Sequence, residues 1–352
     1  MDGEKNKIVV VIISYNGWQY LPDCFRSLEE QTLLPEEIII VDNNSNDGTK
    51  ELLADLASLT LKVKIIFNKK NLGFAQANNQ GITEALKINP DYIFLLNQDT
   101  VCHRECLEQL AKSDSREQVF AKQALILCWP PENGLIQTAG DKIHFLGFGH
   151  SGDYRLQITG YRLQVKEITY ASGAAMFINA QALEEVGLFD KDSFMYHDDM
   201  EICLRARFLG YKIILAPQAL VYHKYTEKIS RLRWYWSERN RLLTLIKFYK
   251  LPTLILLFIP LILMELGVLG YSLVTGWFLL KIKSYFSILW QLPKTLWKRR
   301  KIQMFRQISD YELAQILEGE FHFAGLEHPL IKYIVNPVFG FFWRICKNLI
   351  FW

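Results

Sequence analysis

The stretch "YIFLLNQDT", Tyr92 to Thr100, joins an apolar strand to a polar cluster. Its first residues have the length and composition of a buried core strand, and polar residues follow at once. A carboxylate at the C-terminal end of a strand is where open α/β sheets often bind a ligand. Asp and Asn also favour turns, because their short side chains hydrogen-bond to the nearby backbone. Asp99 is therefore either a metal ligand or a turn residue.

The same alternation of apolar runs and polar clusters extends through the first hundred residues. We expect strands over 8–13, 37–42, 63–68 and 92–96, and helices over 18–31, 49–59 and 74–86. Strands that alternate with helices predict a parallel sheet, with ligands bound beyond the carboxyl ends of the strands. Polar clusters follow the strands at 14–16, 42–44, 68–71 and 97–100. One ligand site at this edge accounts for them better than unrelated turns.

The composition is that of a globular protein in a reducing compartment. The 352 residues suffice for about two domains, and half of them are hydrophobic. The first residues lack the cationic, apolar and small-residue order of a signal peptide. The six cysteines show no metal-ligand spacing. Both features predict a cytosolic location.

The small net charge of +3 conceals a basic C-terminal segment. Between Lys224 and Lys301 the chain has 15 lysines and arginines against three glutamates. The same segment contains Leu251–Leu280, in which Glu265 is the single charged residue. A basic, aromatic-rich segment beside an apolar one indicates an anionic membrane surface rather than nucleic acid.

The length of the apolar segment matches neither one membrane span nor two. As one straight helix, Leu251–Leu280 would be about 45 Å long, more than the roughly 30 Å of a bilayer core, yet it is too short for two full spans. Prolines and glycines interrupt it. We expect a re-entrant or in-plane helical hairpin. Two spans extending to about Trp290, or a buried soluble helical pair, are the alternatives.

Three carboxylates gather in "YHDDMEICLR": Asp198, Asp199 and Glu201. Acids in the first turn commonly stabilise a helix through its dipole. Adjacent acids also repel one another and raise the pKa of at least one of them when partly buried, which is typical of a general base. His223, which closes the strand "ILAPQALVYH", is either a neutral imidazole ligand or a surface histidine.

Two further residues suggest nucleotide binding. Asp42 ends the second predicted strand, where its carboxylate either accepts the N3–H of uracil or thymine, a donor that adenine lacks, or caps a turn. Gly73 begins a helix whose N-terminal amides suit a phosphate, and the missing side chain permits close approach of a ligand to the backbone. An ordinary loop glycine is the alternative.

The order and spacing of these motifs resemble the inverting GT-A glycosyltransferases of glycosyltransferase family 2, the group that includes bacterial rhamnosyltransferases. The resemblance covers about residues 8–245 and rests on "VVIISYNG", "EEIIIVDNNSNDGT", "NLGFAQANNQGI", "FLLNQDT", "ASGAAMFI", "VGLFD", "FMYHDDMEICLRARFLGY" and "VYH…RNRL". Each motif is weak alone, and the set is specific. It implies an α/β GT-A fold, a Rossmann-like, mostly parallel sheet flanked by helices.

The resemblance also implies roles for matched positions. The residues expected to bind the nucleoside and the diphosphate of the donor are Ser14, Tyr15, Asn16, Asp42, Asn71 and Gly73. Asp99 matches the last Asp of the family's DxD motif, which holds a divalent cation, and His223 would be a second ligand to Mn²⁺ or Mg²⁺. Asn97 replaces the first Asp, as is common in the rhamnosyltransferase-like branch, and leaves one fewer negative ligand.

The family's acidic motif matches "HDDME". Asp199 would be the base that deprotonates the acceptor hydroxyl, which then attacks the anomeric carbon with inversion, and Asp198 takes the family's Glu position. Glu201 is expected to support its helix through Arg205 rather than react. The matches expected on the acceptor or lid side are Gly173, Glu201, Arg239 and Asn240.

The chain is thus expected to have three parts: a nucleotide-sugar-binding half of the GT-A domain (1–100), an acceptor-binding and catalytic half (101–225), and a helical membrane-associated region (226–352). The predicted reaction moves a sugar from dTDP-L-rhamnose or a UDP-sugar to a hydroxyl of a lipid-linked or cell-surface glycan, such as one on a polyprenyl diphosphate, at the cytosolic face of the cell membrane. A polyprenyl-phosphate sugar synthase and a non-catalytic nucleotide-binding scaffold are the alternatives.

Overall fold

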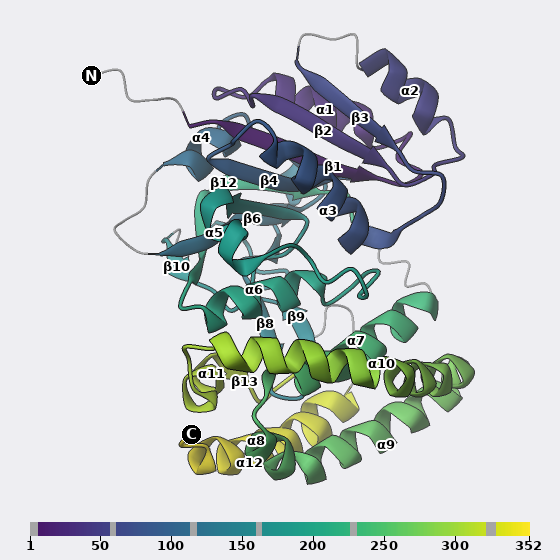
Figure 1. Cartoon of the computed structure of the whole chain (residues 1–352), viewed down its shortest axis with the longest axis vertical. Helices are drawn as coiled ribbons and strands as arrows, with labels where there is room; N and C mark the ends of the chain where they lie inside the picture. Colours follow the sequence, from purple (N-terminus) through teal and green to yellow (C-terminus); the bar gives the residue numbers. More distant parts are fainter. Residues whose placement is uncertain (1–5, 57–60, 113–117, 160–163, 226–230, 322–328) are drawn as a thin grey trace.

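The computed structural model describes residues 6–56, 61–112, 118–159, 164–225, 231–321 and 329–352. Its N-terminal part alternates strands and helices as the sequence predicts (Figure 1). The elements are β1 (Ile8–Ser14), α1 (Leu21–Glu29), β2 (Glu37–Asp42), α2 (Thr49–Leu56), β3 (Val63–Phe67), α3 (Gly73–Leu86) and β4 (Tyr92–Asn97). The four predicted strands are confirmed to within about a residue at each end, and the expected helix end at 57–59 lies outside the described residues.

Both faces of β1, β2 and β4 are buried, which explains their apolar runs, whereas β3 at the sheet edge is partly exposed. In β1, Val9 and Val11 pack into one hydrophobic cluster, and Ile8, Val10 and Ile12 pack into a second. Successive side chains of a strand point to opposite faces of the sheet. A strand that is covered on both faces therefore needs apolar residues throughout. Each such side chain contributes roughly 1.5–3 kcal/mol on full burial.

The middle of the chain adds further strands and three helices. These elements are β5 (Thr100–Cys102), α4 (Cys106–Ala111), β6 (Val119–Cys128), β7 (Ile136–Thr138), β8 (Asp141–His144), β9 (Gly149–Ser151), β10 (Lys166–Glu167), β11 (Ala175–Asn179), α5 (Ala180–Val186), α6 (Asp198–Phe208) and β12 (Lys212–His223). A short 3₁₀ turn covers Pro131–Asn133.

The main sheet is mixed, with the strand order β10-β12-β6-β11-β4-β1-β2-β3. Strands β4, β1, β2 and β3 are parallel neighbours, as predicted. Strand β11 lies antiparallel to both β4 and β6, and β12 is again parallel to β6, so the expectation of a parallel sheet holds without exception only for β1 to β4. The reason is the direction of the chain: β11 starts beside the carboxyl end of β4, where Ala175 pairs with Leu96, and runs away from it.

The register of the sheet brings the polar clusters to one edge. Ser14 pairs with Asp42 across β1 and β2, and Ile13 pairs with Asn97 across β1 and β4. His223, at the end of β12, pairs with Thr100 of β5. The predicted donor and metal residues therefore share one end of the sheet.

The C-terminal part forms a helical layer below the sheet in the view of Figure 1. Its helices are α7 (Arg231–Phe248), α8 (Leu251–Leu256), α9 (Phe258–Val274), α10 (Phe278–Phe305), α11 (Asp310–Ile316) and α12 (Asn336–Leu349), with a π-helical turn at Ile331–Val335. Strand β13 (Leu317–Glu318) pairs in parallel with β8 and joins this layer to the middle of the chain.

The apolar segment Leu251–Leu280 is divided among α8, α9 and the start of α10. Within the described ranges, no helix combines the length and the apolarity needed to cross a bilayer. The single charge of the segment, Glu265, forms ion pairs with Arg241 and, at 2.7 Å, with Lys281. Both cations are fully buried and also pair with Glu238. Glu265 therefore ties α9 to α7 and α10.

Candidate active site

The β1–α1 loop is held against the end of β4 by one amide side chain. Gln98 Oε1 accepts hydrogen bonds from Ser14 Oγ at 2.9 Å and from the Tyr15 amide at 3.1 Å. Gln98 Nε2 donates to the Tyr15 carbonyl at 3.1 Å. Ser14 is buried and Tyr15 is 47% exposed, so the loop presents an aromatic ring to solvent. Sequence reasoning missed Gln98, which it quoted only as the middle residue of "NQD".

Asp42 caps a turn at the end of β2. Its two carboxylate oxygens accept hydrogen bonds from Ser45, one from the hydroxyl and one from the amide at 3.1 Å, and the side chain is fully buried. Ser45 Oγ in turn accepts from the Asn16 amide at 2.8 Å, and Asn16 Oδ1 accepts from the Asn46 amide at 3.0 Å. The turn-capping interpretation is therefore observed, and the nucleoside role stays a prediction.

Asn71 and Gly73 begin α3 beside the loop that precedes α6. Asn71 Oδ1 accepts from the Gly73 amide at 2.8 Å and from Asn43 Nδ2 at 3.1 Å. Gly73 has φ +80°, and a Cβ there would lie 2.3 Å from the Phe194 carbonyl oxygen. The glycine therefore permits close approach of the Phe194 backbone, where the sequence suggested approach of a ligand.

Asp99 and His223 meet as predicted. His223 Nε2 lies 3.1 Å from Asp99 Oδ1, and Asn97 immediately precedes this turn. Burial opposes ionisation of Asp99, but the hydrogen bond and electrostatic attraction of His223 outweigh it and lower the pKa of the carboxyl. His223 Nδ1 is buried and has no hydrogen-bond partner among the described residues.

This pair fits a partial metal site. A carboxylate and an imidazole are both accepted ligands for Mn²⁺ or Mg²⁺, and Mg²⁺ sites commonly use one or two protein ligands with phosphates and waters. The ring nitrogen that faces Asp99 is Nε2, so a cation held by both residues would take the place of the hydrogen bond between them. In the part of the chain described here, no cluster of three or more His, Cys, Asp or Glu side chains forms a complete site. Phosphate oxygens would have to supply the remaining ligands.

The acidic pair lies at the start of α6. Asp199 is half-buried, and its carboxylate accepts from the Gly173 amide at 3.2 Å and from the Met200 amide at 2.8 Å. Asp198 is buried, and its Oδ2 atom has no hydrogen-bond partner among the described residues. Burial, and then repulsion from Asp199, raise the pKa of Asp198 to about 8, and burial also raises the pKa of Asp199. Protonation of Asp198 at neutral pH leaves Asp199 as the anionic member.

A third carboxylate lies close to this pair. Asp141 is buried at the start of β8, and the Thr138 hydroxyl donates to it. Burial raises its pKa to about 8, and Asp199 adds repulsion. Sequence reasoning missed Asp141. Its position next to the acidic motif depends on the docking of β8 and was not visible from spacing.

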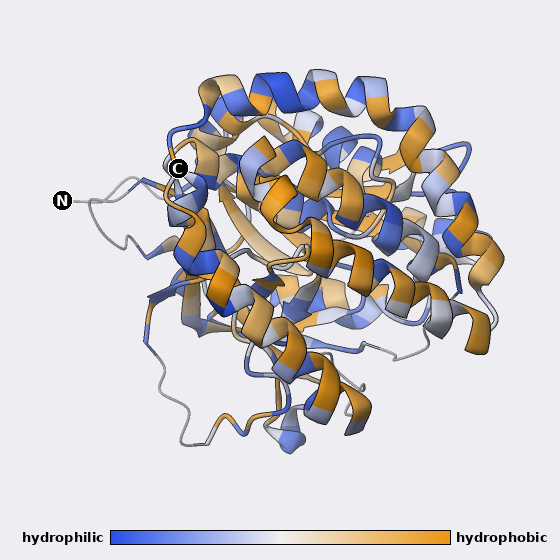
Figure 2. Ribbon diagram, turned by 90° about the horizontal axis from the view of Figure 1, so that it is seen from below, coloured by the Kyte–Doolittle hydropathy of each residue, from blue (hydrophilic) through white to orange (hydrophobic). Residues whose placement is uncertain are grey.

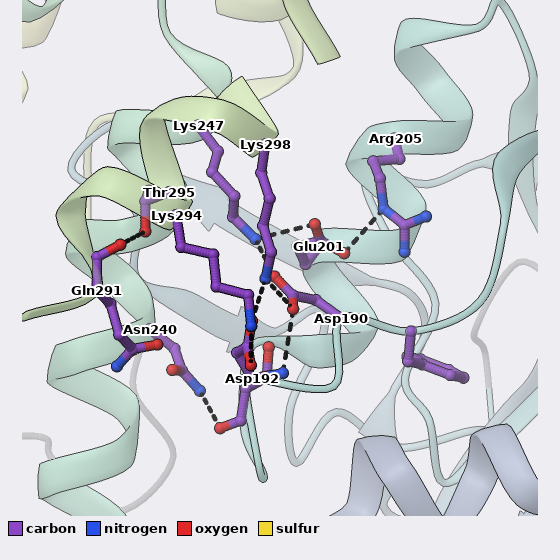
Figure 3. Close-up of polar contacts among 12 residues, drawn as sticks. Asp190, Asp192, Glu201, Arg205, Asn240, Lys247, Gln291, Lys294, Thr295 and Lys298 are labelled. Carbon is purple, nitrogen blue, oxygen red and sulfur yellow. Dashed lines mark hydrogen bonds and ion pairs between the residues drawn. The ribbon is translucent and has the colours of Figure 1, made fainter. Parts of the chain in front are cut away.

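Glu201 supports the helix, as expected. Its carboxylate pairs with Arg205 Nε at 3.0 Å and with Lys247 Nζ at 2.9 Å, and it is buried. Burial opposes its ionisation, but the two cations outweigh burial and lower its pKa. Figure 3 shows Lys247 reaching from α7 between Glu201 and Asp190. Glu201 is therefore fully engaged in an ion-pair network.

The same network continues to α10. Lys294 and Lys298 extend toward Asp190 and Asp192, which precede α6 (Figure 3). Lys298 Nζ lies 2.6 Å from Asp192 Oδ2 and also pairs with Asp190. Lysines from two helices of the C-terminal layer thus hold the start of the loop that leads to the acidic pair.

Arg239 and Asn240, expected on the acceptor or lid side, are buried beneath this loop. Asn240 Nδ2 donates to the carbonyls of Ser193 at 3.0 Å, Met195 at 3.0 Å and Tyr196 at 2.7 Å. Arg239 donates to the carbonyls of Asp192 at 2.6 Å and Ser193 at 2.8 Å. The loop contains three non-glycine residues with positive φ, at Phe194, Tyr196 and His197. Such backbone persists only when its surroundings fix it, so the two side chains position the acidic pair.

Known proteins resemble this chain in sequence. A family model described as glycosyl transferase family 2 matches residues 9–187. An uncharacterized glycosyltransferase, YwdF of Bacillus subtilis (strain 168), is 28% identical over 222 residues, which are 63% of this chain and 75% of that protein. The dTDP-rhamnosyl transferase RfbF of Shigella flexneri is 26% identical over 265 residues, 69% of this chain and 81% of that protein.

Two solved structures share the fold. GalNAc-T7 with UDP, GalNAc and Mn²⁺ aligns with a TM-score of 0.57 at 18% identity, over 70% of this chain and 48% of that one. The mannosyltransferase PcManGT of Pyrobaculum calidifontis, in complex with GDP-Man and Mn²⁺, aligns with a TM-score of 0.52 at 14% identity, over 99% of this chain and 87% of that one. At these identities the likeness establishes the α/β fold alone.

Proposed function

The chain belongs to glycosyl transferase family 2 and is a glycosyltransferase, and on that premise we propose that it transfers a sugar with inversion from dTDP-L-rhamnose or a UDP-sugar to a glycan hydroxyl. The observation that carries the proposal is the Asp198–Asp199 pair at the start of α6. One carboxylate is buried with a raised pKa, and the other is oriented by the Gly173 amide at 3.2 Å. The name of RfbF supports the choice of dTDP-rhamnose as a first donor.

In this mechanism Asp199 accepts the proton of the acceptor hydroxyl. The oxygen attacks the anomeric carbon from the face opposite the nucleotide, and the bond to the diphosphate breaks. Asp198 has the raised pKa and holds the proton, so that Asp199 is the negative member of the pair, while the negative charge of Glu201 is paired with Arg205 and Lys247. A divalent cation, Mn²⁺ or Mg²⁺, bound by Asp99 and His223 would neutralise charge on the departing diphosphate.

The proposed donor side is the edge formed by the ends of β1, β2 and β4. Its residues are Ser14, Tyr15, Asn16, Asp42, Asn71, Gly73 and Asn97. Tyr15 offers an exposed ring for a nucleobase, and Gln98 fixes the loop that carries it. The proposed acceptor is a lipid-linked or cell-surface glycan, such as one on a polyprenyl diphosphate, at the cytosolic face of the cell membrane. The basic helical layer supports this location.

The test is nucleotide diphosphate release by purified protein from UDP-, dTDP- and GDP-sugars, with Mn²⁺, Mg²⁺ or chelator. Wild type is compared with Asp199→Asn and with the control Asp91→Asn. Asp91 lies at the opposite end of the sheet, where it accepts a hydrogen bond from the Lys7 amide. We expect metal-stimulated release of dTDP or UDP that is lost only in Asp199→Asn. Loss of a positioned base typically costs about 10²–10⁴-fold in rate.

The same assay, repeated with different acceptor molecules, distinguishes the alternative functions. Transfer to polyprenyl phosphate, but not to a polyprenyl diphosphate-linked glycan, would favour a polyprenyl-phosphate sugar synthase. Nucleotide binding without turnover on any acceptor, with equal binding by Asp199→Asn, would favour a non-catalytic scaffold and contradict the proposal.

A further inference from the structure

Helix α10 turns its polar side toward the protein. Lys281 and Ser284 are fully buried, and Thr295 is nearly so. Lys281 Nζ pairs with Glu265 at 2.7 Å and donates to Glu238 Oε2 at 2.5 Å. A surface helix of a globular protein normally buries its apolar stripe and exposes its charges. Helix α10 departs from this pattern, because these three polar residues lie with Ile288 on its buried side.

The solvent side of α10 carries large apolar residues. These are Phe286, Leu289, Trp290, Leu296, Trp297 and Met304. Trp290 is 88% exposed and Trp297 is 57% exposed. Soluble monomers rarely expose contiguous apolar patches of more than a few hundred Å², and larger ones mark interaction surfaces. The outer side of α10 is therefore expected to bind another molecule or surface.

Helix α9 also has polar residues on its inward side, beside the buried Pro260 and Met264. Its inward residues include Ser272, which is fully buried, and Glu265, which is ion-paired with α7 and α10. Its large exposed residues are Phe258, Ile259, Ile262, Leu263, Leu266, Tyr271, Leu273 and Val274. Seen from below, the helical layer carries long hydrophobic stretches along its ribbons (Figure 2). Glu265 of α9 pairs with Lys281 of α10, so the two helices are joined on their inward sides.

The charge of this surface identifies the partner. From Leu251 to Phe305 the chain contains one acidic residue, Glu265, and it faces inward. The exposed cations of α10 are Lys294, which pairs with Asp192, and three more, Lys283, Arg300 and Lys301; Lys301 Nζ lies 3.9 Å from the centre of the Trp297 ring. Apolar and aromatic residues beside basic ones, without acids, match the acyl boundary and phosphate level of an anionic bilayer. A second copy of the chain would oppose like charges.

We propose that the outer sides of α9 and α10 dock in the plane of an anionic lipid surface. The tryptophans and aliphatic side chains enter the interfacial region, the three cations bind lipid phosphates, and the inward ion pairs hold the helices to the catalytic part. This inference deepens the membrane location proposed above. It does not depend on the donor or on the chemistry.

The test is flotation of the purified full chain with phosphatidylcholine vesicles that contain or lack phosphatidylglycerol. We compare wild type with Trp290→Ser/Trp297→Ser and with Arg300→Gln/Lys301→Gln. The control variant, Leu34→Ser/Leu156→Ser, removes two exposed leucines outside the helical layer. We expect binding to the anionic vesicles. Each neutralised cation should weaken it roughly fivefold, and the tryptophan variant should lose it, with the control unchanged.

The results that would contradict membrane docking differ from those that would contradict the proposed sugar transfer. Absence of binding, or equal binding of wild type and the tryptophan variant, contradicts docking through this surface. A concentration-dependent dimer in sedimentation, abolished by Trp290→Ser/Trp297→Ser, identifies a second copy as the partner instead. Because flotation uses no donor, docking can fail while nucleotide release persists, and the reverse also holds. Unchanged thermal unfolding verifies that these outward substitutions leave the fold intact.

Discussion

Replacing Asn240 by alanine should impair catalysis more than nucleotide binding. The Asn240 amide nitrogen donates to the carbonyls of Ser193, Met195 and Tyr196, at 3.0, 3.0 and 2.7 Å. A buried hydrogen bond contributes about 0.5–1.5 kcal/mol net, and a buried polar group left unpaired costs about 1–3 kcal/mol. The amide has two hydrogens, so alanine should lower the free energy of unfolding by roughly 2–4 kcal/mol.

The catalytic effect follows from the backbone of the same loop. Phe194, Tyr196 and His197 have φ near +65°, +65° and +63°. Conformations of this kind cost on the order of 1–3 kcal/mol each and persist only where the surroundings fix them. Without the Asn240 bonds the loop is expected to relax and displace Asp199. A displacement of about 1 Å can cost roughly 10²-fold in rate.

The assay measures kcat for nucleotide diphosphate release, the Kd for nucleotide, and chemical unfolding. We expect kcat to fall about a hundredfold, while the Kd changes little because the donor edge lies on β1, β2 and β4. The matched control is Asn179→Ala, which removes the cap of α5 at the opposite end of the sheet. It should cost about 1 kcal/mol of stability and leave kcat unchanged. An Asn240→Ala protein that is destabilised but retains wild-type kcat would refute this reasoning.

Two further predictions concern buried charge. Lys281→Met leaves two buried carboxylates with one fewer cation and should lower the free energy of unfolding by about 3–5 kcal/mol; a loss below about 1 kcal/mol in urea unfolding would contradict it. The pKa of Asp198 rises from 3.8 to about 8 in the folded protein. The protonated side chain therefore makes its full contribution to the free energy of unfolding below pH 3.8, and this contribution is lost as the pH rises through about 8. Asp198→Asn should therefore raise the Tm relative to wild type by more at pH 9 than at pH 6, and a constant difference would speak against the buried acid.

The N-terminal strands were predictable because their signals are local. An unbroken β-branched run between polar clusters admits few alternatives, and the parallel sheet then places the polar ends together, including Asp99 and His223. Gln98 and Asp141 were not predictable as site residues, because their roles depend on which loop or strand packs beside them. The polarity of α10 was misleading for a related reason: Lys281 is basic in the sequence but fully buried in the fold.

Lys294 and Lys298 of α10 form ion pairs with Asp190 and Asp192, so the shortest active fragment of the chain should include α10. The family match ends at residue 187, and both acidic-pair residues lie before residue 200. A truncation after residue 225 would retain that pair yet remove α7 and α10, and with them the side chains that fix its loop. Chimeras between relatives should therefore exchange residues 190–197 together with α7 and α10 as one module, because side chains of both helices hold the loop.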